Sequence, residues 1–205
     1  IVAANAQTIE QINDKFRQLN EYLPTSNVYR TASGAPGHEY WQQQADYKID
    51  VTLDDENQSI TGSANIRYTN NSPDSLKYIW LQMDQNRFNP KTSIDIAGET
   101  VSPDMDGMSF SAMRSHIERR NFDGGFKVSR LQDLNGSDLS YTVVGSNLRI
   151  DLPIELGPNQ ATDFAIDWYY NVLDSEILRS RQAAEYFERD DNYIYEIAQW
   201  YPRVT

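Results

Sequence analysis

The sequence has no cysteine, only two histidines, and no long apolar run. The absence of cysteine excludes disulfides, thiolate catalysis and thiolate zinc sites. No stretch approaches the roughly 18 apolar residues of a membrane-crossing helix, so we expect no membrane span. Basic side chains are also scarce: 18 against 30 acidic ones give a net charge of -12, which argues against a nucleic-acid partner.

The signatures of several enzyme classes are missing as well. The H-E-x-x-H pattern of zinc peptidases is absent, and His38 and His116 lie far apart without a carboxylate at ligand spacing. We therefore interpret both as surface or hydrogen-bonded histidines. The serine-hydrolase pattern G-x-S-x-G, the dinucleotide pattern G-x-G-x-x-G and a phosphate loop are also absent, which leaves serine and nucleotide chemistry without a candidate residue.

Two acidic stretches deserve separate interpretation. Residues 104–107 (D-M-D-G) begin like a calcium loop, but the twelfth position is Ser115 rather than the glutamate that such a loop requires. Residues 188–191 (E-R-D-D) form an acidic turn, and two carboxylates without known geometry do not define a glycosidase pair. We assign no catalytic residue and no metal ligand in this chain.

Three strands are predicted near the middle of the chain. Apolar and polar residues alternate through residues 45–53 and again through 60–69, the period expected of strands with one buried face. The short polar link at 54–58 predicts an antiparallel hairpin. Residues 76–83 are apolar on both faces, which predicts a strand covered on both sides.

The remainder of the chain predicts a mostly β fold, an antiparallel sandwich or saddle. Residues 89–122 are expected to be irregular, with a short strand near 94–96, and residues 175–188 are a helical candidate. Further strands are predicted by short alternating runs separated by Gly, Asn and Pro turns. These runs are 126–131, 140–144, 148–152, 161–169 and 193–200.

The amino-terminal part is organised differently. Residues 1–6 end in A-N-A, the small-x-small pattern of a signal-peptidase site, and we interpret them as a signal-peptide remnant. A capping-box pattern at Thr8 and an apolar stripe predict a helix up to Pro24. The predicted organisation is therefore residues 1–6 as the remnant, 7–39 as an amino-terminal helix plus an extended strap, and 40–205 as the β-domain.

Two stretches resemble a known family. The segments R-T-A-S-G-A-P-G-H-E-Y-W-Q-Q-Q-A-D-Y (30–47) and Y-I-W-L-Q-M-D-Q-N (78–86) resemble the amino-terminal β-domain of bacterial aminopeptidase N-like proteins, the gluzincin zinc metallopeptidases. The resemblance spans roughly residues 30–203. It implies that this chain is the non-catalytic front of a longer periplasmic or secreted metallo-aminopeptidase, truncated before the catalytic domain.

The resemblance also implies partners and one site residue. The expected partners are the catalytic domain of the same polypeptide, which would carry the zinc, and a peptide substrate; this chain alone is predicted to be inactive and to hold no cofactor. Gln199 matches a family glutamine that lines the pocket for the first substrate side chain. Tyr201 stands where the family has an acidic residue that helps to hold the substrate amine, so only Gln199 carries over.

An alternative hypothesis for the function is based on the aromatic residues. The sequence has 13 Tyr, 7 Phe and 4 Trp, and exposed rings on antiparallel sandwiches often stack on sugars. A carbohydrate-binding module would use the rings of Trp41, Trp168, Tyr169, Tyr170 and Trp200. A purely structural β-sandwich module is the third possibility. A line of exposed coplanar rings would favour sugar, whereas an apolar face ending at Trp200 would favour a missing domain.

Overall fold

The computed structural model describes residues 26–90, 110, 113–114, 117, 121–175 and 182–205. The chain divides into two compact units, Ile1–Gln42 and Gln43–Thr205, which are described separately. In the first unit, Asn27 Oδ1 accepts hydrogen bonds from the backbone N–H groups of Tyr29 and Arg30, both at 2.9 Å. The helix predicted before Pro24 lies outside the described residues, as does the strand predicted near 94–96.

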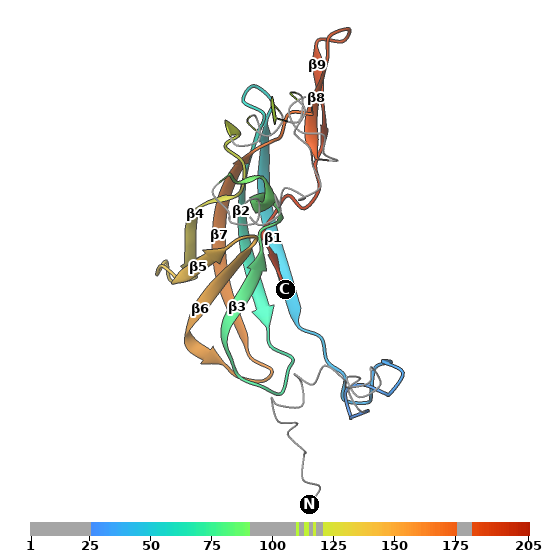
Figure 1. Cartoon of the computed structure of the whole chain (residues 1–205). Helices are drawn as coiled ribbons and strands as arrows, with labels where there is room; N and C mark the ends of the chain where they lie inside the picture. The colour runs from blue at the N-terminus through green and yellow to red at the C-terminus, as the bar shows by residue number, and fades with distance from the viewer. Residues whose placement is uncertain (1–25, 91–109, 111–112, 115–116, 118–120, 176–181) are drawn as a thin grey trace, which may run out of the picture. The chain divides into compact units, whose positions relative to one another are not determined.

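One four-stranded antiparallel sheet carries most of the second unit. Its strands β1 (Gln44–Asp54), β2 (Ser59–Thr69), β7 (Ala161–Asn171) and β4 (Lys127–Asp133) lie side by side in the order β1-β2-β7-β4 (Figure 1). The β1 and β2 strands pair without interruption over their full length, which confirms the hairpin predicted from their alternation.

A second antiparallel sheet has the order β10-β3-β6-β5. It comprises β10 (Arg203–Val204), β3 (Leu76–Gln82), β6 (Asn147–Leu156) and β5 (Tyr141–Val144). A separate hairpin pairs β8 (Ala183–Phe187) with β9 (Asn192–Glu196), and a 3-10 turn, η2 (Asp84–Phe88), follows β3.

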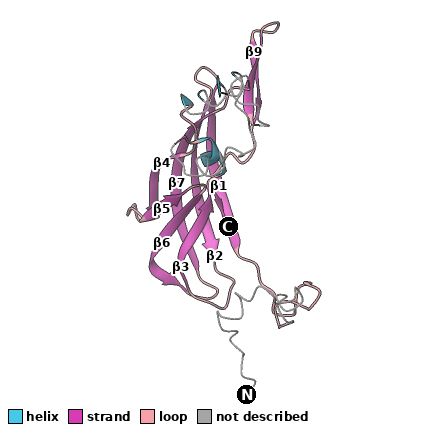
Figure 2. Ribbon diagram, viewed as in Figure 1, coloured by secondary structure: helices cyan, strands magenta, loops and turns pink. Residues whose placement is uncertain are grey.

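Strands dominate the described chain (Figure 2). Within the described ranges there is no α-helix of seven residues or more, so the prediction of a mostly β, antiparallel fold is confirmed. A search of the same residues for a helix long and apolar enough to cross a membrane found none.

The two sheets share one hydrophobic core. Alternate side chains of β2 and β7 point into it, together with the inner side chains of β3 and β6. Gly62 allows the closest approach, because a Cβ atom at this position would lie 2.3 Å from the Trp168 ring. The largest fully buried side chains of the core include Phe164, Ile66, Leu81, Met83, Leu148, Ile150, Ile166 and Trp168.

A buried asparagine joins several turns at one end of the sandwich. Asn70 is fully buried, and its Nδ2 donates to the carbonyl oxygens of Asp74 at 2.7 Å and Leu156 at 3.0 Å. Its Oδ1 accepts from the Ser72 hydroxyl at 2.6 Å and from Gln43 Nε2 at 3.0 Å. One side chain therefore satisfies polar groups from three separate segments, as burial of an amide demands.

The prediction that β3 is covered on both faces is wrong. Ile79 and Leu81 are buried, but Tyr78 on the opposite face is 43% exposed. The Tyr78 and Trp80 rings pack edge-on with their centroids 6.1 Å apart. The guanidinium carbon of Arg149 lies 4.2 Å from the centroid of the Tyr78 ring. Aromatic side chains on this face thus pack against each other and a cation.

The helical candidate at residues 175–188 is also wrong where it is described. Ala183–Phe187 forms strand β8, which pairs antiparallel with β9 from Ala183↔Glu196 to Phe187↔Asn192. The Asp174↔Ala184 bridge adds a parallel contact on the other side. Strand pairing with a partner later in the chain outweighs the local composition here.

Candidate functional site

Gln199 lies in the segment that joins β9 to β10. Its side chain is exposed, and its backbone adopts φ 49, in the left-handed region that non-glycine residues rarely occupy. Such a conformation persists where the surrounding structure holds it. The neighbours of Gln199 explain how it is held.

Two other glutamines hold this segment. Gln85 in η2 is only 5% exposed, and its Nε2 donates to the carbonyl oxygens of Ala198 at 3.0 Å and Gln199 at 3.3 Å. The same atom donates to Gln182 Oε1 at 2.5 Å, and Gln182 Nε2 donates to Gln199 Oε1 at 2.9 Å. The backbone and the side-chain oxygen of Gln199 are therefore both positioned by other amides.

The side-chain nitrogen of Gln199 remains available. Within the described ranges no hydrogen-bond partner contacts Gln199 Nε2, and the residue is exposed. An amide fixed through its oxygen presents its two N–H donors to whatever approaches. Gln85 and Gln182 were not identified from the sequence, although Gln85 lies within the segment 78–86 that carries the family resemblance.

Aromatic contacts anchor the chain immediately after Gln199. The ring centroids of Trp200 and Tyr201 are 4.9 Å apart. The Tyr201 ring packs edge-on against that of Tyr47 in β1, with 5.5 Å between the centroids. The Tyr47 hydroxyl accepts a hydrogen bond from the Val204 backbone N–H at 2.8 Å. Burial raises the pKa of Tyr47, and the hydrogen bond from Val204 opposes this effect in part.

An ion pair also holds this segment. Arg203 Nη2 lies 2.7 Å from Asp84 Oδ2 and 3.2 Å from Gln82 Oε1. The carboxylate beside the segment, Asp84, is therefore already paired with a guanidinium. The arrangement therefore presents an amide at Gln199 rather than an anionic group.

An apolar surface lies on the inner face of β1. Val51 and Leu53 pair with Gly62 and Ile60 and occupy core-facing positions, yet they are 50% and 43% exposed. Ile60, on the neighbouring strand, is almost fully buried. The edge strand β1 thus extends a stripe of core-type side chains to the surface.

The structure does not place His38 in a metal site. His38 Nε2 is 3.8 Å from Glu39 Oε1, and both side chains are more than half exposed. His116 and the acidic stretch at residues 104–107 lie outside the described residues. In the described part of the chain, no group of three or more His, Cys, Asp or Glu side chains could hold a metal ion, so these residues do not fit a zinc site.

The rings proposed for sugar stacking do not form an exposed line. Trp168 and Tyr170 are 1% and 2% exposed and belong to the core. Tyr169 is half-buried, with Lys127 Nζ 5.0 Å from its ring centroid, and the half-buried Trp200 packs against the same core. Trp41 is exposed, but it belongs to the unit Ile1–Gln42. The carbohydrate reading therefore loses the aromatic platform on which it rested.

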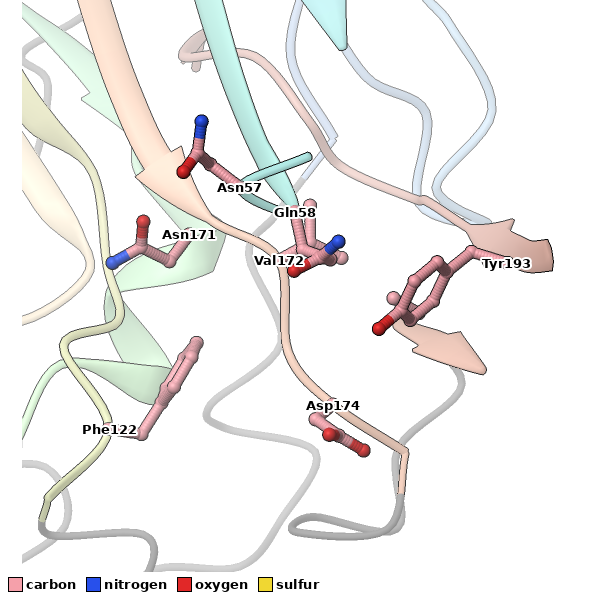
Figure 3. A pocket seen from close by; sticks show the side chains of 8 residues that line it. Asn57, Gln58, Phe122, Asn171, Val172, Asp174 and Tyr193 are labelled. Atoms are coloured by element: carbon pink, nitrogen blue, oxygen red, sulfur yellow. The ribbon is translucent and has the colours of Figure 1, made fainter. Parts of the chain in front are cut away.

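A pocket that the sequence did not indicate lies near the β1–β2 turn. Its volume is about 350 Å³. Its walls come from the β1–β2 turn, the end of β7 with the residues after it, the β8–β9 hairpin, and the segment before β4 (Figure 3). The lining residues are Asn57, Gln58, Phe122, Asn171, Val172, Asp174, Ala184 and Tyr193.

Comparison with known proteins gives distant likenesses, in structure alone. No family model and no curated protein matches the sequence. Among solved structures, the fold is similar to part of M1 zinc metallopeptidases. A mutant of a two-domain M1 zinc metallopeptidase bound to L-tryptophan is 11% identical, with a TM-score of 0.37; the match covers 62% of this chain and 21% of that one.

Two further M1 zinc metallopeptidase structures, both of mutants from Deinococcus radiodurans, match in the same way. One is bound to the substrate Tyr-Ser-Ala, is 13% identical and has a TM-score of 0.38, covering 67% of this chain and 23% of that one. The other is 13% identical with a TM-score of 0.39, and the match covers 69% of this chain and 24% of that one. The present chain thus spans less than a quarter of the length of each structure that it resembles.

Proposed function

We propose that this chain is the non-catalytic amino-terminal β-domain of a zinc-dependent metallo-aminopeptidase. In this role the domain packs on a catalytic domain of the same polypeptide and helps to shape the cleft for the amino-terminal residue of a peptide. The proposal places zinc and the catalytic groups in that other domain and derives no chemical step from the residues of this one. It also places the protein in the periplasm or outside the cell.

The observation that carries the proposal is the positioned carboxamide of Gln199. Gln85 and Gln182 hold its backbone carbonyl and its side-chain oxygen, and the Nε2 donors of this exposed residue have no partner among the described residues. A substrate-contacting group is effective when its own supports restrict it before the ligand arrives. The sequence resemblance gives Gln199 this role, and its geometry suits a residue that lines a pocket.

The apolar surface of β1 supports the packing half of the proposal. Val51 and Leu53 are half-exposed at core-facing positions, and Ile194 of β9 is 55% exposed. Burying such side chains is favourable by about 25 cal/mol per Å² of apolar area, so an exposed apolar stripe is a typical docking surface. The proposed occupant is the catalytic domain.

The first experiment is to determine the intact mass and the sequence of the native gene product from its own host. We expect a product several hundred residues longer than this chain, with H-E-x-x-H downstream of Thr205. A product that ends near Thr205 would overturn the proposal.

The second experiment is kinetic and uses that full-length protein. Gln199→Ala should raise KM for peptide substrates about tenfold, as expected for a lost hydrogen bond worth about 1.4 kcal/mol, with a smaller effect on kcat. Gln85→Ala should raise KM by a smaller factor, because it releases the support and leaves the contacting amide in place. Gln44→Ala is the matched control, since among the described residues the exposed Gln44 amide bonds only Asp46, its neighbour on β1. Equal kinetics for Gln199→Ala and Gln44→Ala would refute the assigned role.

A further inference from the structure

The pocket near the β1–β2 turn is built from backbone segments that are hydrogen-bonded to each other. The Val172 N–H donates to the Gln58 carbonyl at 2.7 Å, which joins the end of β7 to the turn. The Ala184 N–H donates to the Leu173 carbonyl at 2.7 Å, which joins β8 to the same stretch. The lining is therefore preformed, and the N–H groups of Val172 and Ala184 are already used.

The side-chain amides of the pocket also have their nitrogens engaged. Asn57 Nδ2 donates to Asp54 Oδ2 at 2.7 Å, and Asn171 Nδ2 donates to the Asp123 carbonyl at 2.9 Å. Gln58 Nε2 donates to the Asp55 carbonyl at 2.6 Å. Because these nitrogens face their partners, the oxygens of Asn57 and Gln58 are the polar atoms left for a ligand.

Two further groups add acceptor capacity. The Tyr193 hydroxyl points toward the Val172–Asp174 segment (Figure 3), and it has no hydrogen-bond partner among the residues that the structure describes. Asp174 supplies a carboxylate to the wall. A carboxylate has about four acceptor positions, so it can bind a ligand donor beside a partner that it already has.

Aromatic rings and nearby acidic residues also surround the pocket. Phe122 and Tyr193 provide aromatic surface to the pocket, which attracts cations through the negative faces of the rings. Three consecutive acidic residues, 54–56, form the neighbouring β1–β2 turn, and the whole chain carries a net charge of -12. The site is thus rich in acceptors, aromatic and surrounded by negative charge.

We propose that this pocket binds the ammonium or guanidinium group of a basic side chain. The volume of about 350 Å³ suits one lysine or arginine side chain with its aliphatic part against Phe122 and Val172. Neutral sugars and anions are poorer ligands, because they need donors from a wall that offers mainly oxygens. The proposal concerns residues other than Gln199 and does not rest on a peptidase function.

The test is a titration of the 205-residue chain followed by nuclear magnetic resonance of its backbone amides. The probes are N-acetyl-lysine methylamide and N-acetyl-arginine methylamide, with N-acetyl-glutamine methylamide and glucose as neutral comparisons. We expect roughly millimolar dissociation constants for the cationic probes, with shifts centred on Gln58, Ala184 and Tyr193. Binding of the neutral probes should be at least about tenfold weaker, and salt should weaken the binding of the cationic ones.

Variants sharpen the test. Asp174→Asn should weaken binding of the cationic probes by about fivefold or more. Tyr193→Phe, which keeps the ring and removes the hydroxyl, should weaken their binding by about twofold. Asp50→Asn makes the same charge change on the exposed face of β1 and should leave affinity unchanged. The comparison of charged with neutral probes on the unmodified chain remains decisive if a variant unfolds.

Three results would overturn the proposal: neutral probes that bind as tightly as cationic ones, an Asp174→Asn effect no larger than that of Asp50→Asn, or no shift with any cationic probe. Cadaverine, a free diamine, separates the two sources of the same group. Equal affinity for cadaverine and the lysine probe assigns the pocket to the ammonium alone, whereas tighter binding of the lysine probe assigns it to a peptide side chain. Since the assay measures binding, its outcome is independent of whether Gln199 serves a peptidase.

Discussion

The sandwich and the β8–β9 hairpin belong to the same unit, but they are stabilised in different ways. In the sandwich, Phe164 and its neighbours on two sheets are almost completely buried in one core. In the hairpin, Tyr186, Phe187 and Ile194 remain substantially exposed. A two-stranded hairpin in isolation is only marginally stable, so its order depends on a small number of contacts with the rest of the unit.

Some of those contacts are specific and polar, beside the packing of Ala184, Tyr193 and Tyr195 against the core. The Tyr195 hydroxyl bonds Asp55 Oδ1 at 2.6 Å, which ties β9 to the β1–β2 turn. The Ser175 N–H donates to the Ala184 carbonyl at 3.0 Å and ties β8 to the end of the preceding segment. The sandwich is thus a stable support, and the hairpin is a weaker element that carries both the proposed pocket and the chain leading to Gln199. Three predictions test this division.

The largest difference is expected between two phenylalanines. Phe164→Ala should lower the free energy of unfolding by about 3–5 kcal/mol, because it leaves a cavity in the core. Phe187→Ala, the matched change in the hairpin, should lower it by about 0.5 kcal/mol or less, since Phe187 is 38% exposed. Urea denaturation of both variants provides the measurement. Comparable losses would mean that the hairpin is as much a part of the cooperative core as β7.

A smaller effect is expected from a polar residue of the sandwich. Asn70→Ala should lower the free energy of unfolding by about 2–3 kcal/mol, because it leaves the carbonyl oxygens of Asp74 and Leu156 without their buried donor. Asn65→Ala, on the exposed face of β2, is the control and should change stability by about 0.5 kcal/mol or less. The same denaturation assay applies, and a neutral Asn70→Ala variant would show that water replaces the amide.

The smallest effect concerns the hairpin and depends on pH. Partial burial and then the hydrogen bond to Asp55 raise the pKa of Tyr195 from 10.0 to about 12. A folded-state pKa above the unfolded value favours the neutral phenol, so its contribution is complete below pH 10 and is lost as the pH rises toward 12. Burial also raises the pKa of Tyr170, so ultraviolet titration should show several late-ionising tyrosines, one of which Tyr195→Phe removes.

The same variant tests the tie between hairpin and sandwich. Tyr195→Phe should speed hydrogen exchange in β8 and β9 about two- to fivefold, as expected for a bond worth about 0.5–1 kcal/mol, with exchange in β2 and β7 unchanged. Tyr193→Phe serves as the control, because the Tyr193 hydroxyl has no hydrogen-bond partner within the described residues. Unchanged exchange in β8 and β9 would show that other contacts hold the hairpin.

Much of the sandwich was predictable because its strands follow a simple period. The alternation through residues 45–53 and 60–69 predicted β1 and β2 and their pairing, and short alternating runs predicted most later strands. The prediction failed at β8 and at the outer face of β3. In both cases composition suggested one environment and a tertiary partner decided another: the next strand, β9, for β8, and the distant Arg149 for Tyr78.

The candidate site was also predictable only in part. The family resemblance, which spans roughly residues 30–203, pointed to Gln199, and its role stays a prediction. The partners Gln85 and Gln182 were not predictable, because they reach Gln199 from η2 and from the start of β8. Nor was the pocket, whose walls come from four separate segments.

The sequence by itself determined the class of fold, the β1–β2 hairpin and the residue types available for chemistry, because alternation and composition are local properties of a chain. Only the tertiary structure decided which amides hold Gln199, which aromatic rings are buried, and which oxygens face the pocket. These features depend on contacts between residues such as Gln85 and Gln199, which are brought together when the sheets pack. No short-range pattern in the sequence records such a contact.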